Sequence, residues 1–233
     1  MLVPSGALDY RITGLQGHSS KCYYLCYSIK MPGRNTIKVY VADSYYHLYN
    51  RGWNRTELFL DNEDYGYFEF LLSRHLSPEI VKDKQGREYP HHYPIIHLNA
   101  YCLMPNHFHL LTYQTDESGI KKLASSVLTA YTMYFNKKYR RRGPLFENTY
   151  KAVRVDNDEY LMHITRYIHL NHKRYTSWPF SSYRDYIRTP RTWIDPEPIL
   201  GLYTSKSAYK EFVDDYESEQ RTREAIKSEM ANG

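Results

Sequence analysis

The chain has 233 residues, of which 42% are hydrophobic, and a formal net charge of +5. This length and composition suit one large domain with its own core, and the modest basic excess is compatible with a polyanionic partner. The sequence excludes a membrane-spanning helix, which needs roughly 20 consecutive apolar residues. The N-terminus does not show the pattern of a secretory signal. The chain has three cysteines, an odd number, which argues against a disulfide framework. We therefore expect a cytoplasmic protein with free thiols.

Residues 1–42 show no sustained hydrophobic period and are expected to form an N-terminal extension. Met31 precedes a more ordinary start of a domain, so one hypothesis is that translation begins there. Residues 43–190 are expected to form the main domain, and residues 191–233 a charged helical tail. The 26 tyrosines offer rings that stack on unpaired bases, although a general tyrosine bias would give the same excess.

The first half of the domain predicts a strand, a helix and a hairpin. "SYYHLYNRG" (44–52) is rich in residues that favour strands and ends at a glycine. The segment 61–76 begins with acidic residues and continues with apolar residues at helical spacing. A polar loop or flexible hairpin follows. Two strands, 95–104 and 107–115, are separated by the turn pair Pro105–Asn106.

The second half predicts a long helix over 118–139, a strand over 148–155 and a helix over 156–175, with Asp156 as its N-cap. A further helix is expected from Ser205 to about Lys227. The order β-α-β-β-α-β predicts an α+β fold of the ferredoxin-like, split βαβ type. Its four-stranded antiparallel sheet would carry two helices on one face, which leaves the third helix free to pack on the other.

Two histidines lie in the apolar run "YCLMPNHFHLLTY". His107 and His109 are two residues apart in a strand, so both imidazoles project from one face, opposite to Phe108. They are a pair of metal ligands, a proton-handling site or a coincidence. On the third helix, Tyr167 and Asn171 are four residues apart and share a face. Two imidazoles and an amide oxygen would leave positions on a divalent metal for phosphate oxygens, while the phenol serves as nucleophile.

Five stretches in this order resemble the REP-associated branch of the single-tyrosine HUH transposases. They are "YHLYNRGWNRTELFLDNEDYGYF", "MPNHFHLL", "GPLFENTYKA", "YLMHITRYIHLNH" and "WPFSSYRDY", and together they cover roughly residues 43–187. The resemblance implies that His107, His109 and Asn171 bind the metal and that Tyr167 is the nucleophile, with Tyr160 as the alternative. The chain departs from many relatives in having a histidine, His172, after Asn171, so the helix is expected to run on, with His172 near the metal or exposed.

The implied activity is metal-dependent cleavage and rejoining of single-stranded DNA near hairpins, with Mg²⁺ or Mn²⁺ and a 5′-phosphotyrosine intermediate. The resemblance is compatible with a monomer or a homodimer. Three alternatives remain at this stage: a replication-initiator or relaxase-like nickase, a DNA-hairpin-binding regulator that has lost catalysis, and an unrelated metal-dependent hydrolase.

Basic residues near these elements are candidate DNA contacts. For each of them a solvated helix end or a surface salt bridge is the alternative interpretation. The candidates are Lys137, Lys138, Arg140, Arg141 and Arg142 in "NKKYRRRGP", together with Arg51, Arg154 and Arg166.

Overall fold

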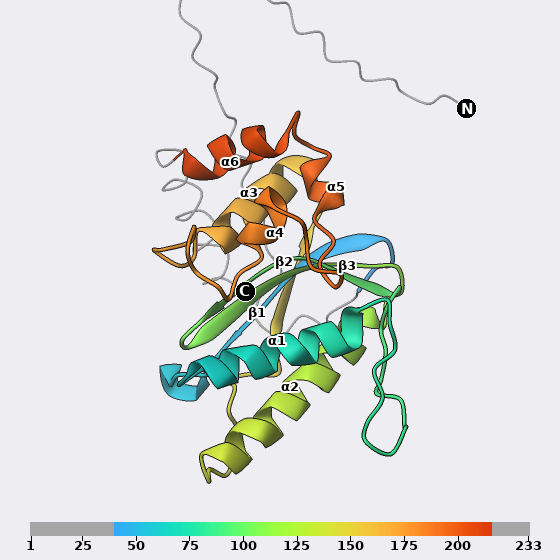
Figure 1. The fold of residues 1–233 in the computed structure, drawn as a ribbon, viewed down its shortest axis with the longest axis vertical. Helices are drawn as coiled ribbons and strands as arrows, with labels where there is room; N and C mark the ends of the chain where they lie inside the picture. Colours follow the sequence, from blue (N-terminus) through green and yellow to red (C-terminus); the bar gives the residue numbers. More distant parts are fainter. Residues whose placement is uncertain (1–39, 216–233) are drawn as a thin grey trace, which may run out of the picture.

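The computed structural model describes residues 40–215 of the chain (Figure 1). Four strands form one antiparallel sheet in the order β2-β3-β1-β4. This order confirms the predicted α+β fold with a split βαβ topology. The strands are β1 (Ser44–Arg51), β2 (Ile96–Met104), β3 (His107–Gln114) and β4 (Lys151–Val155).

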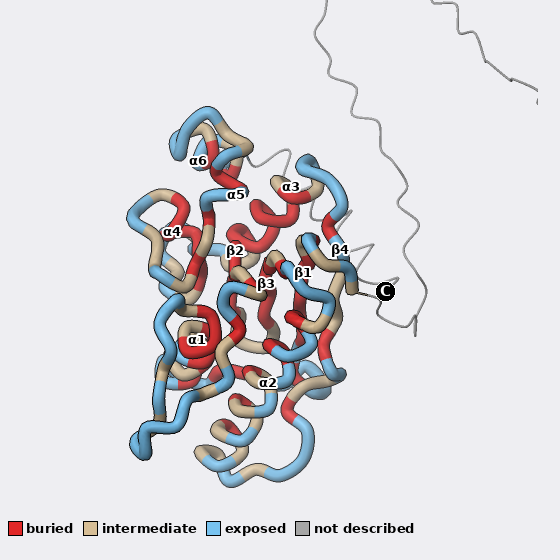
Figure 2. Tube along the Cα trace, turned by 90° about the vertical axis from the view of Figure 1, so that its right-hand side faces the viewer, coloured by how far each residue is buried: buried red, intermediate tan, exposed pale blue. Residues whose placement is uncertain are grey.

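Helices cover both faces of the sheet, and each face has its own hydrophobic core (Figures 1 and 2). On one face lie α1 (Asn62–Leu76) and α2 (Gly119–Lys138). On the other lies α3 (Asp158–His169), covered by the shorter α4 (Tyr183–Ile187), α5 (Glu197–Leu200) and α6 (Lys206–Asp214). A 3₁₀ turn, η1 (Trp53–Arg55), follows β1.

The alternation of side chains along β3 separates the two cores. Phe108 and Leu110 pack in the core under α1 and α2, whereas Leu111 belongs to the core under α3. His107 and His109 have the parity of Leu111, so they face α3, as the period of two predicts. On β2, a register shift between Leu98 and Ala100 moves the later residues by one position.

Helix α3 differs from its prediction at both ends. Its N-cap is Asn157 rather than Asp156, because the Asn157 side chain accepts a hydrogen bond of 2.7 Å from the Tyr160 amide. The helix ends at His169 instead of running on, so Asn171 lies in the turn that follows. His172 stacks on Trp178, with 3.8 Å between ring centroids.

The C-terminal segment packs on the domain as far as it is described. Tyr209 of α6 is buried, its ring stacks on Tyr186 of α4 at 4.7 Å, and its hydroxyl contacts His169 of α3. The packing of α6 on α3 and α4 therefore joins the expected tail, as far as residue 215, to the expected main domain. The helix expected from Ser205 begins at Lys206, and its continuation beyond residue 215 lies outside the described residues.

The expected extension, with Met31 and two of the cysteines, also lies outside them, apart from residues 40–42. The third cysteine, Cys102, is a buried free thiol as expected. Within residues 40–215, no helix has the length and apolar character needed to cross a membrane.

A candidate active site between the sheet and helix α3

Helix α3 packs against β2 and β3 and brings a tyrosine to the two histidines. The Tyr167 ring lies edge-on to His109, with 5.3 Å between centroids, and is 6% exposed. In the turn after α3, Asn171 Oδ1 is 3.0 Å from His107 Nε2. The structure thus brings together the four residues that the sequence singles out, from β3, α3 and the following turn.

His107 contacts two amide oxygens, one on each ring nitrogen. Its Nδ1 is 2.7 Å from Asn106 Oδ1, and its Nε2 faces Asn171 Oδ1. Burial lowers the pKa of His107, against an opposing effect of the Asn171 hydrogen bond. A neutral imidazole has one N–H and can donate to only one of these oxygens. A cation between Nε2 and Oδ1 would satisfy the remaining pair, so the residues present fit a metal ion.

His109 is held by a third histidine, which the sequence reasoning missed. His47 of β1 places Nε2 2.8 Å from His109 Nδ1, and both side chains are 1% exposed. Burial lowers the pKa of His47 to about 3 and that of His109 well below its ordinary value, so both rings are neutral. When His109 Nδ1–H donates to His47, the Nε2 atom of His109 is left as a potential metal ligand.

Two further residues of this face were missed. Tyr49 lies opposite His109 in the β1–β3 pairing, with 5.9 Å between their rings. Burial raises the pKa of Tyr49 to about 12, and interaction with Tyr167 adds to the shift. Lys151 of β4 pairs with Tyr49, and its ammonium lies 5.9 Å from the Tyr49 ring centroid. Lys151 is therefore a basic group on the same face as the histidines.

The other tyrosine considered as nucleophile, Tyr160, lies toward the beginning of α3. It precedes Tyr167 by seven residues, or roughly 10 Å along the helix axis. The ring contacts of Tyr167 with His109 and His47, at 5.3 and 6.3 Å, favour Tyr167 over Tyr160.

Two imidazole nitrogens and one amide oxygen form a mixed donor set that is compatible with Mn²⁺, Mg²⁺ or Zn²⁺. Across the part of the chain that the structure describes, no group of three or more histidine, cysteine, aspartate or glutamate residues could hold a metal ion. A three-ligand site at His107 and His109 therefore depends on Asn171.

Five of the eight basic candidates are exposed or half-buried, so their charges are accessible from solvent. Arg51 lies opposite His107 in the β1–β3 register, so it shares that face, and it forms an ion pair with Glu147. Lys137, Arg140 and Arg142 are exposed near the end of α2, where Arg141 stacks on Phe135.

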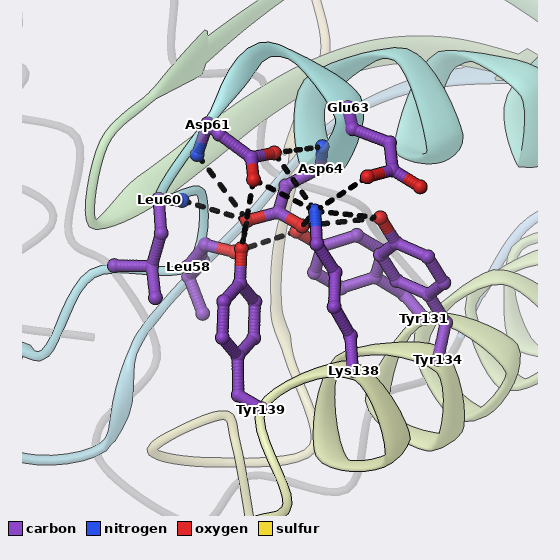
Figure 3. A network of polar contacts seen from close by, with 9 residues as sticks. All are labelled: Leu58, Leu60, Asp61, Glu63, Asp64, Tyr131, Tyr134, Lys138 and Tyr139. Atoms are coloured by element: carbon purple, nitrogen blue, oxygen red, sulfur yellow. Dashed lines mark hydrogen bonds and ion pairs between the residues drawn. The ribbon is translucent and has the colours of Figure 1, made fainter.

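The other three candidates are not supported as DNA contacts. Arg166 is fully buried and donates to the Phe212 carbonyl at 3.2 Å. Arg154 pairs in register with Tyr46, which packs in the core under α1 and α2, so it faces away from the histidines. Lys138 forms ion pairs with three carboxylates at the start of α1 (Figure 3): Asp61, Glu63 and Asp64.

Comparison with known proteins gives a family and two similar structures. Residues 88–171 match the family described as IS200-like transposases. No curated protein matches the chain. A solved REP-associated tyrosine transposase bound to a REP hairpin is 14% identical, covering 66% of this chain and 85% of that one with a TM-score of 0.49. A protein of Deinococcus radiodurans assigned as a transposase is 19% identical, covering 61% and 98% with a TM-score of 0.36.

The matched segment contains His107, His109, Tyr167 and Asn171, the four residues of the candidate site. The recognition of a transposase from the sequence motifs is thereby confirmed at the level of the family. Residues 88–171 thus resemble the IS200-like transposases, in agreement with the sequence motifs.

Proposed function

We propose that the protein is a metal-dependent endonuclease and strand transferase that acts on single-stranded DNA near hairpins. The observation that carries the proposal is the meeting of Tyr167 with His109 at 5.3 Å, while His107 Nε2 lies 3.0 Å from Asn171 Oδ1. A phenol beside a candidate set of metal ligands is the arrangement that nucleophilic attack on a phosphodiester requires.

The cation would be held by His107, His109 and Asn171. When bound, Mg²⁺ or Mn²⁺ supplies positive charge that polarises the scissile phosphate. The chain's own residues do the rest of the positioning. Asn106 and His47 each engage one Nδ1 atom, which would leave the Nε2 atoms of His107 and His109 to hold the metal.

Tyr167 is the nucleophile in the proposed reaction. Its phenolic oxygen forms a bond to phosphorus, and the bond from phosphorus to the 3′ oxygen breaks. The phenol releases its proton and the departing 3′ oxygen takes one up, so no net proton is consumed. Attack by another 3′-hydroxyl on the 5′-phosphotyrosine reverses these steps and joins two strands. No nucleotide cofactor is needed, because the number of phosphodiester bonds is conserved.

Hairpin-containing DNA is proposed as the substrate on the strength of the five sequence stretches that resemble the REP-associated branch. Arg51, on the face of the histidines, and the exposed Lys137, Arg140 and Arg142 are the proposed phosphate contacts. Lys151 is added to this set because it lies on the same face as His109.

A cleavage assay tests the proposal. Hairpin oligonucleotides taken from the sequence beside the gene are incubated with the protein, with and without Mg²⁺ or Mn²⁺. We expect a covalent protein–DNA adduct that requires metal and disappears in Tyr167→Phe. Tyr160→Phe is the matched control and should still form the adduct. An adduct that persists in Tyr167→Phe would show that another residue is the nucleophile. Binding without cleavage would favour a DNA-hairpin-binding regulator that has lost catalysis.

A further inference from the structure

The turn after β1 presents an indole ring to solvent close to the candidate active site. Trp53 is 53% exposed, which is unusual for so large an apolar side chain. The turn is joined to the histidine hairpin because Gly52 N donates to the Asn106 carbonyl at 2.9 Å. Asn106 is also the residue whose side chain contacts His107. One residue therefore links the Trp53 turn to a candidate metal ligand.

The backbone around Trp53 is held in a costly conformation. Asn54 and Arg55 have positive φ angles of 51° and 61°, which few residues other than glycine adopt. A Cβ atom on Gly52 would lie 2.0 Å from the Thr56 carbonyl oxygen, so only glycine fits there. Trp53 N donates to the Leu145 carbonyl at 2.9 Å, and this bond fixes the turn from its other side. Such strain persists where surrounding contacts determine it, and it is concentrated at functional sites.

Charges around the exposed ring favour an anionic partner. Arg51 and Arg55 lie two residues before and after Trp53, and both are exposed. Arg140 and Arg142 precede Leu145 in the loop to which the turn is bonded. Two carboxylates lie among them: Glu147, which pairs with Arg51, and the exposed Glu57. The arginines outnumber them by four to two.

We propose that Trp53, with Arg51 and Arg55, forms a subsite that stacks one unpaired nucleobase of the DNA strand next to the scissile phosphate. An aromatic face takes any base, while the guanidinium groups bind the flanking phosphates. This inference rests on the proposed function, since it assumes that single-stranded DNA enters the site. The occupant is unpaired DNA rather than a protein partner, because exposed arginines flank Trp53 in the sequence and others lie in the loop to which its turn is bonded.

Equilibrium binding tests the subsite with a hairpin oligonucleotide that carries single-stranded flanks. The proteins are wild type, Trp53→Ala, Trp53→Phe and the control Met133→Ala, which removes an exposed side chain of α2 on the opposite face of the sheet. We expect Trp53→Ala to weaken binding about tenfold, Trp53→Phe to retain most of the affinity, and Met133→Ala to match wild type. A blunt hairpin without flanks should bind wild type and Trp53→Ala equally.

Indole fluorescence gives a second readout. Stacking on a base should quench wild-type emission, and the quenching should be largely absent in Trp53→Phe, which keeps Trp178 and Trp193. Wild-type affinity in Trp53→Ala, or an equal loss of affinity for the blunt hairpin, would overturn the subsite. If wild type forms the covalent adduct while Trp53→Ala binds normally, the subsite fails and the proposed function stands. If wild type neither binds nor cleaves, the proposed function itself fails.

Discussion

Each candidate ligand histidine has its Nδ1 atom engaged by a neighbouring side chain. Asn106 contacts Nδ1 of His107 at 2.7 Å, and His47 contacts Nδ1 of His109 at 2.8 Å. Metal-binding histidines commonly use the nitrogen remote from such a partner, because the partner fixes the tautomer and the ring orientation. His47 is thus a positioning residue in the proposed site, because it acts on the metal only through His109.

Replacing His47 should weaken metal binding without removing a ligand. We expect His47→Phe to lower the affinity for Mn²⁺ about 10- to 100-fold, as measured by calorimetric titration of the purified protein. His47→Gln keeps a polar partner for Nδ1 and should restore part of the affinity. His97→Gln is the control, since His97 lies on β2 beside Asp195, with its Nδ1 3.5 Å from that carboxylate. Unchanged affinity in a folded His47→Phe protein would contradict the assignment.

Sequence reasoning placed His107 and His109 on one face from the period of 2.0 along β3, and it singled out Tyr167 and Asn171 mainly through the resemblance to the HUH transposases. It missed His47 and Lys151 because their nearness to His109 arises from strand pairing, which no local pattern encodes. It chose Arg166 by proximity in sequence to Tyr167. Adjacent helical positions point in different directions, and Arg166 lies under α6 instead.

At the scale of elements, a polar cluster joins the start of α1 to the end of α2 (Figure 3). Asp64 is fully buried and accepts hydrogen bonds from the Leu60 amide at 2.8 Å, from the Tyr139 hydroxyl at 2.7 Å and from Lys138 at 2.8 Å. Asp61 and Asp64 form the capping box of α1. Lys138 therefore neutralises a buried carboxylate and links the two helices of this layer.

Removing that ammonium should destabilise the protein. Lys138→Met leaves the Asp64 carboxylate buried without its cation, and we expect a loss of about 3 kcal/mol in the free energy of unfolding. Lys137→Met removes the neighbouring exposed lysine and should change stability by less than about 0.5 kcal/mol. Urea denaturation measures both. Equal stabilities of the two variants would show that the cluster is of no energetic importance.

The same cluster predicts that the stability of the protein depends on pH. The Lys138 hydrogen bond lowers the pKa of Asp61 below its ordinary value in the folded protein. A carboxylate with a depressed folded-state pKa contributes stability above its unfolded pKa of about 4 and loses it as the pH falls through the folded value. Wild type should therefore lose stability below about pH 4 more steeply than Lys138→Met. Parallel stability curves across this range would contradict the contribution of Asp61.

The positions of most helices and strands can be predicted from local sequence patterns, whereas the residues at which they end depend on contacts of single side chains. Both helices of the split βαβ unit lie where apolar residues recur at helical spacing. The end of α3 was placed wrongly because a histidine after Asn171 does not by itself extend a helix. His172 instead stacks on Trp178, six residues further along the chain, and this contact is not visible in the sequence.

At the scale of the whole molecule, the two helical layers have different roles. The layer of α1 and α2 forms an aromatic and aliphatic core with the sheet. The layer of α3 holds Tyr167 against the histidines, and α4 and α6 hold α3 in place through His169, whose Nε2 lies 2.8 Å from Ser182 Oγ. Within the described residues, β3, α3 and the turn after α3 of one chain bring the four central residues of the candidate site together.

This single-chain site predicts the outcome of mixing two inactive variants. In the proposed mechanism, His107→Ala lacks a metal ligand and Tyr167→Phe lacks the nucleophile, so neither should form the covalent DNA adduct. A mixture of the two should also be inactive, because α3 packs on the sheet of its own chain. If two chains exchanged α3, one site of a mixed dimer would regain both residues, and adduct would return at a substantial fraction of the wild-type yield. Light scattering of the mixture shows whether mixed dimers exist, so absence of adduct with dimers present would establish catalysis within one chain.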